Sequence, residues 1–178
     1  MKDFLLLNGM KHSPISNYAG IPGLTSWLIG EPHPERGLVR LFECSRQHYE
    51  AITPHSHRFD FHCEVLSGVV MNVVWTPDAS GDLYQETKAV YAGQPGKYRR
   101  ESGGIRAWKQ AQKEYRTGDS YAMTSAAVHS IYFSRGARVL FFEGPAKSDY
   151  SIILEPVVDG DVIPTFATPS WAFKKVPG

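Results

Sequence analysis

The sequence predicts an all-β fold, a sandwich or barrel built from many short strands. Two observations lead to this prediction. Short runs of β-branched and aromatic residues recur along the chain, and glycine, proline or polar turn residues separate them at close spacing. The chain has 178 residues, of which 42% are hydrophobic and 21% charged, as is usual for one globular domain. We therefore expect a single all-β domain over residues 1–178.

The expected strands begin at residue 37. Residues 37–43 and 49–53 carry β-branched and aromatic side chains between glycine and proline, and residues 65–75 form a longer apolar run. The polar turn 78–82 then leads into a run at 83–91, which predicts a hairpin. Further strands with turn residues between them are expected at 116–123, 128–134, 137–143 and 150–154.

Segments interrupted by glycine and proline flank these strands. The N-terminal arm, residues 1–34, contains Asn-Gly and Pro-Gly pairs, which favour loops and short strands. Prolines also interrupt the C-terminal tail, residues 156–178. We expect Trp171 and Phe173 to anchor this tail within the fold, because isolated aromatic residues near a terminus usually pack against the core.

Residues 93–112 are rich in glycine, arginine and lysine, and we expect them to form a basic loop inserted between strands. Guanidinium groups in such a loop would suit a carboxylate or phosphate on a substrate. We favour a solvated loop, because runs of charge usually lie in water. Only Glu101 and Glu114 oppose the basic side chains of this region, which are Lys97, Arg99, Arg100, Arg106, Lys109, Lys113 and Arg116.

Charge and cysteine content set further limits. A formal net charge of +1 gives no whole-molecule field that would attract nucleic acid or an acidic membrane. No apolar run approaches the roughly 20 residues needed to span a bilayer, and residues 1–10 do not have the pattern of a signal peptide. Two cysteines, Cys44 and Cys63, do not make a disulfide framework. We expect a reduced, cytoplasmic protein without nucleic-acid or membrane partners.

Residues 54–64 concentrate three histidines and two carboxylates in a predicted strand, turn and strand. Successive side chains of an extended chain point to opposite faces, so His55 and His57 project from one face. A turn after Arg58 would return a third donor beside them, for which His62 is a candidate, and the sequence does not fix the strand parity that decides whether His62 faces the site. Imidazole is a common ligand for Zn, Fe, Cu and Ni, so this segment predicts a metal site.

A further histidine, His129, follows a glycine turn and a run of small residues. The segment from Gly118 to His129 resembles the second motif of the cupin superfamily, which reads Gly, five residues, Pro-x-Gly, two residues, His, three residues, Asn. The spacing agrees throughout. Thr124, Ala126 and Phe133 stand where the family has proline, glycine and asparagine.

The first cupin motif reads Gly, five residues, His-x-His, three or four residues, Glu, six residues, Gly. Tyr49 replaces its leading glycine, and His62 occupies the position of its glutamate. Gly68 comes one residue earlier than the pattern asks, and a register shift at that deletion would let Glu64 supply the carboxylate. The resemblance implies a double-stranded β-helix, or jelly-roll barrel, with few short helices and a metal in its cavity. It also implies a homodimer.

Two ligand sets follow from the resemblance. Ordinary cupins imply His55, His57, His129 and a carboxylate, whereas the thiol dioxygenases, a cupin branch without that carboxylate, imply the three histidines alone. In that branch a His-Cys pair follows the His-x-His, as His62-Cys63 does here, and the cysteine crosslinks to a downstream tyrosine. The branch's Ser-x-His-x-Tyr is absent after His129, so the alternative is that Cys63 is a small buried residue.

Three classes of function follow from a metal site in a cupin barrel. We favour a mononuclear non-haem iron dioxygenase that binds one Fe(II) and acts on a small polar molecule. A second class is a Zn, Mn or Ni enzyme of the isomerase, lyase or hydrolase kind with Glu64 or Asp60 as base. A third class is a non-catalytic barrel that binds a small ligand.

Three side chains near the predicted metal site are expected to orient the substrate: Arg58, Tyr121 and Tyr132. Trp75 is a further candidate for the cavity wall. The alternative for Arg58 is an ion pair with Asp60 across the turn, and the alternative for the aromatic residues is ordinary core packing.

Overall fold

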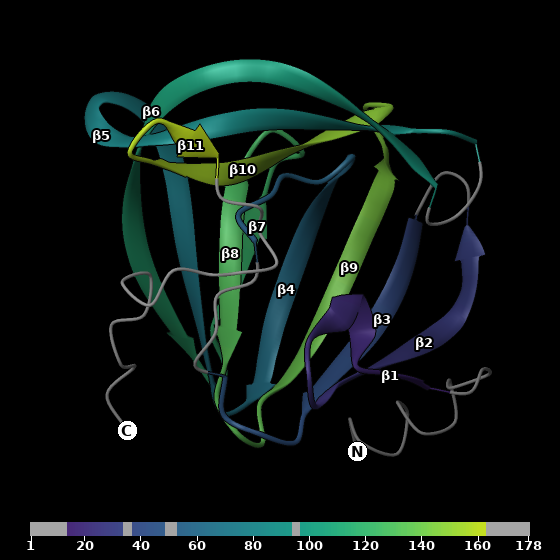
Figure 1. The fold of residues 1–178 in the computed structure, drawn as a ribbon. Helices are drawn as coiled ribbons and strands as arrows, with labels where there is room; N and C mark the ends of the chain where they lie inside the picture. The colour runs from purple at the N-terminus through teal and green to yellow at the C-terminus, as the bar shows by residue number, and fades with distance from the viewer. Residues whose placement is uncertain (1–13, 34–36, 49–52, 94–96, 163–178) are drawn as a thin grey trace.

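The computed structural model describes residues 14–33, 37–48, 53–93 and 97–162. This part of the chain is almost entirely β-structure, as predicted (Figure 1). Its elements are β1 (Ile15–Ser16), the 3-10 turn η1 (Tyr18–Gly20), β2 (Leu24–His33), β3 (Gly37–Cys44), β4 (Phe59–Ser67), β5 (Val69–Tyr91), β6 (Tyr98–Arg116), β7 (Ser120–Met123), β8 (Val128–Phe133), β9 (Arg138–Ala146), β10 (Tyr150–Val158) and β11 (Asp161–Val162).

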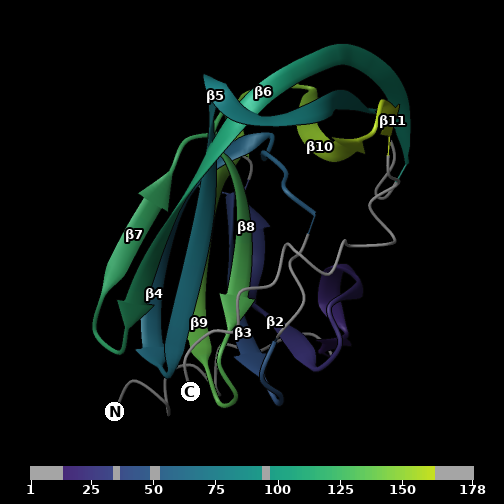
Figure 2. The same cartoon turned by 60° about the vertical axis from the view of Figure 1, so that its left-hand side comes forward.

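Two antiparallel sheets face each other across the interior (Figures 1 and 2). The first has the strand order β1-β2-β3-β9-β4-β7, and the second has the order β11-β10-β5-β6, with β8 paired to the first part of β5. A short bridge at His55 lies between β8 and β10 and extends the second sheet.

The strand pairs are nested in the manner of a rolled-up hairpin. From the outside of the chain inwards, β3 pairs with β9, His55 with β8, β4 with β7, and β5 with β6. This nesting of eight segments across two sheets is the jelly-roll arrangement. The predicted fold class, an all-β jelly roll, is confirmed.

The hairpin β5–β6 is longer than the sequence predicted and arches over one end of the barrel (Figure 1). Residues 78–82, expected as its turn, instead form a bulge, because Pro77 and Asp82 both pair with Trp108. The true turn comes after β5, where the Ala92 amide bonds to the Lys97 carbonyl. Residues 98–112, most of the expected basic loop, therefore belong to strand β6, whose backbone groups are satisfied by pairing with β5.

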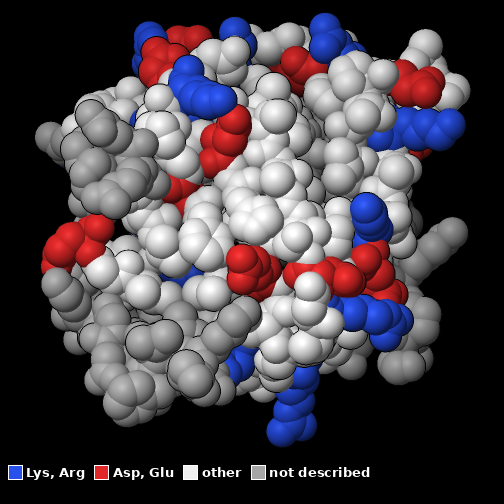
Figure 3. All heavy atoms as spheres, turned by 180° about the vertical axis from the view of Figure 1, so that it is seen from behind, with Lys and Arg blue, Asp and Glu red and all other residues white. Residues whose placement is uncertain are grey.

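Several basic side chains of β6 form ion pairs. Their partners are carboxylates on β6 itself, on β5 and on β10, in the pairs Arg99–Glu101, Arg100–Glu155, Arg106–Glu86 and Arg116–Glu114. On the face of the molecule seen in Figure 3, acidic and basic side chains are interspersed around an uncharged centre. The predicted absence of nucleic-acid and membrane partners stays a prediction. No helix among the described residues is long and apolar enough to cross a membrane.

The buried side chains form two clusters. The larger lies between the sheets and includes Phe61, Tyr121, Phe133 and Phe141. The smaller packs around Trp75, Tyr132 and other residues under the β5–β6 arch. Of the two flanking segments, the arm contributes β1, η1 and β2, and the start of the tail contributes the end of β10 and β11. The predicted anchors Trp171 and Phe173 lie outside the described residues.

Candidate metal centre

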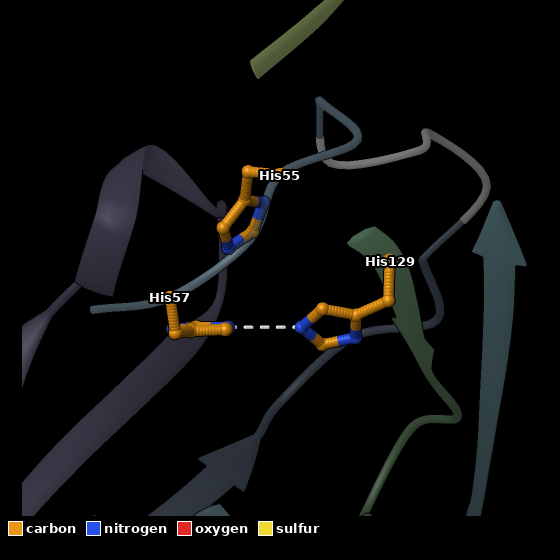
Figure 4. Close-up of side chains that lie close together, drawn as sticks. All are labelled: His55, His57 and His129. Carbon is orange, nitrogen blue, oxygen red and sulfur yellow. Dashed lines mark hydrogen bonds between the residues drawn. The ribbon is translucent and has the colours of Figure 1, made fainter. Parts of the chain in front are cut away.

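Three histidines from distant parts of the sequence meet at one end of the space between the sheets (Figure 4). Backbone pairing positions two of them, because the His55 amide bonds to the His129 carbonyl at 3.0 Å and the reverse bond measures 2.9 Å. His57 follows two residues later and projects toward the same site, as strand alternation predicted. The candidate ligand atoms of the three imidazoles all lie within 4.8 Å of one another.

Hydrogen bonds fix the orientation and tautomer of two of these rings. Nδ1 of His55 lies 2.7 Å from the Thr53 carbonyl, and Nδ1 of His129 lies 3.0 Å from Oδ1 of Asn72. Both oxygens are acceptors, so each ring carries its proton on Nδ1 and directs the Nε2 lone pair into the site. Orientation of a ligand histidine through its other nitrogen is typical of metal sites.

The third ring completes the arrangement. Nε2 of His57 lies 2.9 Å from Nε2 of His129 (Figure 4). Because the proton of His129 is on Nδ1, His57 donates this bond from Nε2 when no metal is bound. Metal binding would require the His57 proton to move to Nδ1 or to leave, since a ligand nitrogen must present a lone pair.

Burial keeps the cluster uncharged. Burial lowers the pKa of His55. Burial, followed by repulsion from the neighbouring histidines, lowers the pKa of His57 to about 2 and that of His129 to about 3. All three rings are therefore neutral near neutral pH, which is the protonation state that metal ligation needs. The chemistry and the convergence of the donors both fit a transition-metal ion.

His62 and Glu64, the two candidates for a further ligand, lie outside this cluster. In β4 the side chains of Phe61, Cys63 and Val65 are buried against the core, so the alternate residues His62 and Glu64 point outward. Their side chains are 44% and 41% exposed, and His62 Nε2 lies 3.9 Å from Glu64 Oε1. The alternation of side chains along β4, which the sequence did not fix, therefore places both His62 and Glu64 outside the interior.

A cavity of about 260 Å³ extends from the histidines into the larger core cluster. Its walls are mainly aromatic and aliphatic, as is usual for a small-molecule site. The side chains that line it include Tyr18, Ile21, Leu24, Phe42, Phe59, Phe61, Cys63, Tyr121, Ile131, Phe133, Val139, Phe141 and Glu143. Within the described residues, Glu143 is the only carboxylate in that lining.

The predicted orienting residues are divided by the structure. Tyr121 lines the cavity. Tyr132 and Trp75 belong to the smaller cluster, because alternation along β8 directs His129, Ile131 and Phe133 to the cavity and Tyr132 away from it. The guanidinium of Arg58 lies 4.1 Å from the centre of the Tyr91 ring and is not part of the lining.

Asp60 does not pair with Arg58 across the turn. Its carboxylate instead accepts a 2.6 Å hydrogen bond from Lys147 and a 2.8 Å hydrogen bond from the Ser125 amide. These bonds lower the pKa of Asp60, with the Lys147 bond as the largest cause. Asp60 therefore links two loops and is not directed at the metal centre.

Cys63 and Tyr121 are direct cross-strand neighbours and are both buried. Burial raises the pKa of the Cys63 thiol to about 12, and it raises the pKa of Tyr121 further above its ordinary value. Tyr121 is thus the downstream tyrosine beside Cys63. A covalent link between them stays an expectation from the thiol dioxygenase resemblance.

Sequence reasoning missed two residues of this site, Asn72 and Glu143. Asn72 is completely buried and accepts the bond from His129. One signal was available for it, since a lone asparagine inside the apolar run 69–75 must find a buried partner. No comparable signal pointed to Glu143, because a glutamate at the end of a strand is usually exposed.

Comparison with known proteins gives structural matches alone. No family model and no curated sequence matches the chain. Similar solved structures include KdgF from Halomonas sp. (14% identity, TM-score 0.42, 75% of this chain and 89% of the other) and an RmlC-like cupin from Shewanella frigidimarina (16%, 0.41, 79% and 90%). The Drosophila melanogaster CENP-C cupin domain is also similar (11%, 0.44, 80% and 92%).

The fold and the site together define a jelly-roll protein with a three-histidine cluster placed to bind a metal ion. Two of the three solved structures are cupins, the superfamily that the two sequence motifs resemble. The assignment of the jelly-roll fold to this chain rests on its own nested strand pairs.

Proposed function

We propose that this protein is a metal-dependent enzyme, a mononuclear non-haem Fe(II) dioxygenase-like oxidoreductase that acts on a small molecule in the cavity. One observation carries the proposal: three neutral imidazoles converge at the end of a largely apolar cavity, with no carboxylate in their group among the described residues. Three neutral ligands leave the full charge of the ion and several coordination positions available. Fe(II) held in this way supplies binding positions for both a substrate heteroatom and O₂.

The residues around the histidines have separable tasks. Thr53 and Asn72 hold the His55 and His129 rings in the ligating tautomer. Phe59, Phe61 and Phe141 lie against the His57 ring and would reduce its contact with water. Exclusion of water strengthens electrostatic interactions in the site and protects reactive species from side reactions.

The Lewis-acid alternative has less support. It requires Glu64 or Asp60 as the catalytic base. The Glu64 side chain points outward, and the Asp60 carboxylate accepts a hydrogen bond from Lys147. A Zn, Mn or Ni enzyme would need a base that reaches the substrate, and Glu143 is the sole described carboxylate in the cavity. A non-catalytic ligand-binding role would preserve the cavity and show no turnover.

The first test is elemental analysis of the purified protein after anaerobic reconstitution with Fe(II), in a form without a metal-binding tag. We expect close to one iron per chain in the wild type and in His62→Ala, the matched control that removes an outward-facing imidazole. We expect none in the variant with His55, His57 and His129 all changed to alanine. Equal metal content in wild type and triple variant would contradict the proposed site.

The second test concerns the reaction. The iron-loaded wild type should consume O₂ with at least one member of a panel of compact thiols, diketones and phenols, and the triple variant should not. Turnover with zinc but without O₂ consumption would favour the Lewis-acid class. Ligand binding with no turnover under any of these conditions would favour the non-catalytic class.

A further inference from the structure

Glu143 is the one cavity residue whose chemistry does not match its surroundings. It lies on β9, which runs between β3 and β4 (Figure 1), and it continues the alternation of Val139 and Phe141, both of which line the cavity. Its carboxyl has no hydrogen bond and no ion pair with any residue that the structure describes. Burial raises its pKa, with a smaller opposing effect from the charges of Arg40 and Arg58.

A partly buried carboxyl without a protein partner is unfavourable unless something else satisfies it. Removal of such a group from water costs free energy that a leucine at the same position would not cost. The cavity beside Glu143 is lined mainly by apolar side chains, so a molecule bound there would replace water as the hydrogen-bond partner of its carboxyl. A site built to hydrogen-bond its substrate gains selectivity, because it rejects analogues that lack the matching group.

The position of Glu143 relative to the histidines defines the ligand further. Glu143 pairs with Phe61 in the sheet register. The Phe61 ring centre lies 4.8 Å from that of His57 and 5.4 Å from that of His129. Phe61 is therefore a neighbour of both polar groups of the site, the histidines and the carboxyl. A cavity of about 260 Å³ suits one ring with a short chain, since about 150 Å³ is enough for benzene.

The charged side chains near the Glu143 carboxyl indicate which kind of ligand group would bind to it. The guanidinium groups of Arg40 and Arg58 both act on Glu143, so two positive charges oppose one negative charge in this region. An ammonium group on a ligand would be repelled by the two arginines, whereas a neutral donor would not. A hydroxyl or amide N–H also leaves water at a smaller cost than an ion does.

We propose that Glu143 is a specificity-determining residue whose carboxyl accepts a hydrogen bond from a neutral donor on a compact, mainly apolar substrate. A second polar group of that substrate faces the three histidines. The inference rests on the proposed function in taking the cavity as the substrate site. It adds that the substrate carries two polar groups on an aromatic or similarly apolar body.

The test uses two probes of nearly the same shape, 2-phenylethanol and propylbenzene, in which a hydroxyl replaces a methyl group. Their dissociation constants are measured by calorimetry or ligand-observed NMR on metal-free protein, for the wild type, Glu143→Gln and Glu143→Leu. Glu114→Leu is the matched control, because Glu114 is an exposed glutamate ion-paired with Arg116 on β6. We expect the preference for the alcohol over the hydrocarbon to fall about tenfold in Glu143→Leu, the effect of one lost hydrogen bond.

We expect Glu143→Gln to retain most of the preference, because its amide oxygen is still an acceptor, and Glu114→Leu to leave it unchanged. An equal ratio of the two dissociation constants in wild type and Glu143→Leu would overturn the proposal, and so would failure of both probes to bind. Since the measurement needs no metal, its outcome is independent of the iron test. If iron binds but the ratio of the two dissociation constants is the same in Glu143→Leu as in the wild type, only the proposed role of Glu143 is rejected, and the metal site is not.

Discussion

At the scale of single residues, the metal centre depends on side chains that hold the ligands as much as on the ligands themselves. Asn72 is the clearest case, because it is fully buried and its Oδ1 accepts the hydrogen bond from His129 Nδ1 at 3.0 Å. Without an acceptor there, the neutral His129 ring is free to carry its proton on Nε2, the atom that must bind metal.

Replacement of Asn72 by leucine should therefore weaken metal binding by roughly 10- to 100-fold, the usual effect of losing such a partner. Asn72→Asp keeps an acceptor in place and should restore much of the affinity. Competition with a chromophoric chelator measures both values, and thermal unfolding of the metal-free variants reports whether they fold. Wild-type affinity in folded Asn72→Leu would show that Asn72 does not orient His129.

The depressed histidine pKa values predict how stability depends on pH. Folded His57 and His129 have pKa values of about 2 and about 3. An unfolded histidine has a pKa of about 6.5. Between these limits the unfolded state binds more protons than the folded state, so the free energy of unfolding falls as the pH falls below about 6.5. Each buried histidine should lower it by about 2 kcal/mol between pH 6.5 and 5.

Urea unfolding of metal-free protein at pH 7 and pH 5 measures this dependence. His129→Gln should reduce it, because one proton-binding site of the unfolded state is lost. His62→Ala removes a solvent-facing histidine and should leave the dependence close to that of the wild type. An unchanged pH dependence in His129→Gln would contradict the neutral, buried state of this ring.

Spacing identified the candidate ligands but not their neighbours. His55 and His57 were predicted from alternation, and His129 from its distance to a glycine turn; the structure brings these three together. Whether His62 faces the site was open because it depends on where β4 begins after the turn, and a shift of one residue reverses every side chain. With β4 starting at Phe59, both His62 and Glu64 face outward.

At the scale of secondary-structure elements, the long hairpin shows where turn signals mislead. Residues 78–82 have the composition of a turn, yet β5 continues through them as a bulge opposite Trp108. Local composition does not distinguish a bulge from a turn, because both need residues that tolerate irregular backbone. The prediction of a basic loop at 93–112 was wrong for the same reason. With a turn expected at 78–82, no strand was left for residues 98–112 to pair with, whereas in the structure they pair with β5.

Gly81 lies in this bulge, and its substitution tests whether the bulge requires a glycine. A Cβ atom at position 81 would come within 2.2 Å of the Trp108 carbonyl oxygen, although the Gly81 backbone has no positive φ. Gly81→Ala should therefore lower the free energy of unfolding by about 3 kcal/mol or more, through displacement of the paired strand. Gly20 is the contrasting control: it has φ +75° but open space around it, so Gly20→Ala should cost only about 1 kcal/mol.

Denaturant unfolding of the two variants gives both values. Equal destabilisation by Gly81→Ala and Gly20→Ala would indicate that close approach to Trp108 is not what requires glycine at position 81.

At the scale of the whole molecule, the sequence predicted the barrel because most of its strands are short apolar or alternating runs bounded by turn residues. It did not predict the character of the cavity, which depends on which faces of β4, β8 and β9 meet across the barrel. The structure makes that space aromatic, with Glu143 as its single described carboxylate. The homodimer and the cytoplasmic location, both expected from the sequence, stay predictions.

The metal centre also joins the two sheets. His57 leads directly into β4 of the first sheet, whereas His129 lies on β8 of the second. An ion bound to both histidines ties the sheets together, and it binds the folded chain alone because the unfolded chain does not hold the three rings in one place. At a free metal concentration 100 times the dissociation constant, the gain in stability is about 2.7 kcal/mol.

For a chain of this size that gain corresponds to a rise in Tm of roughly 5–10 °C. Calorimetry of the wild type with and without a saturating divalent metal measures the shift, and a chelator should reverse it. His62→Ala should show the full rise, since its imidazole faces solvent, and the His55, His57 and His129 triple alanine variant should show none. A rise of equal size in the triple variant would place the stabilising metal elsewhere in the chain, and the three histidines would then be a buried polar cluster rather than the ligand set.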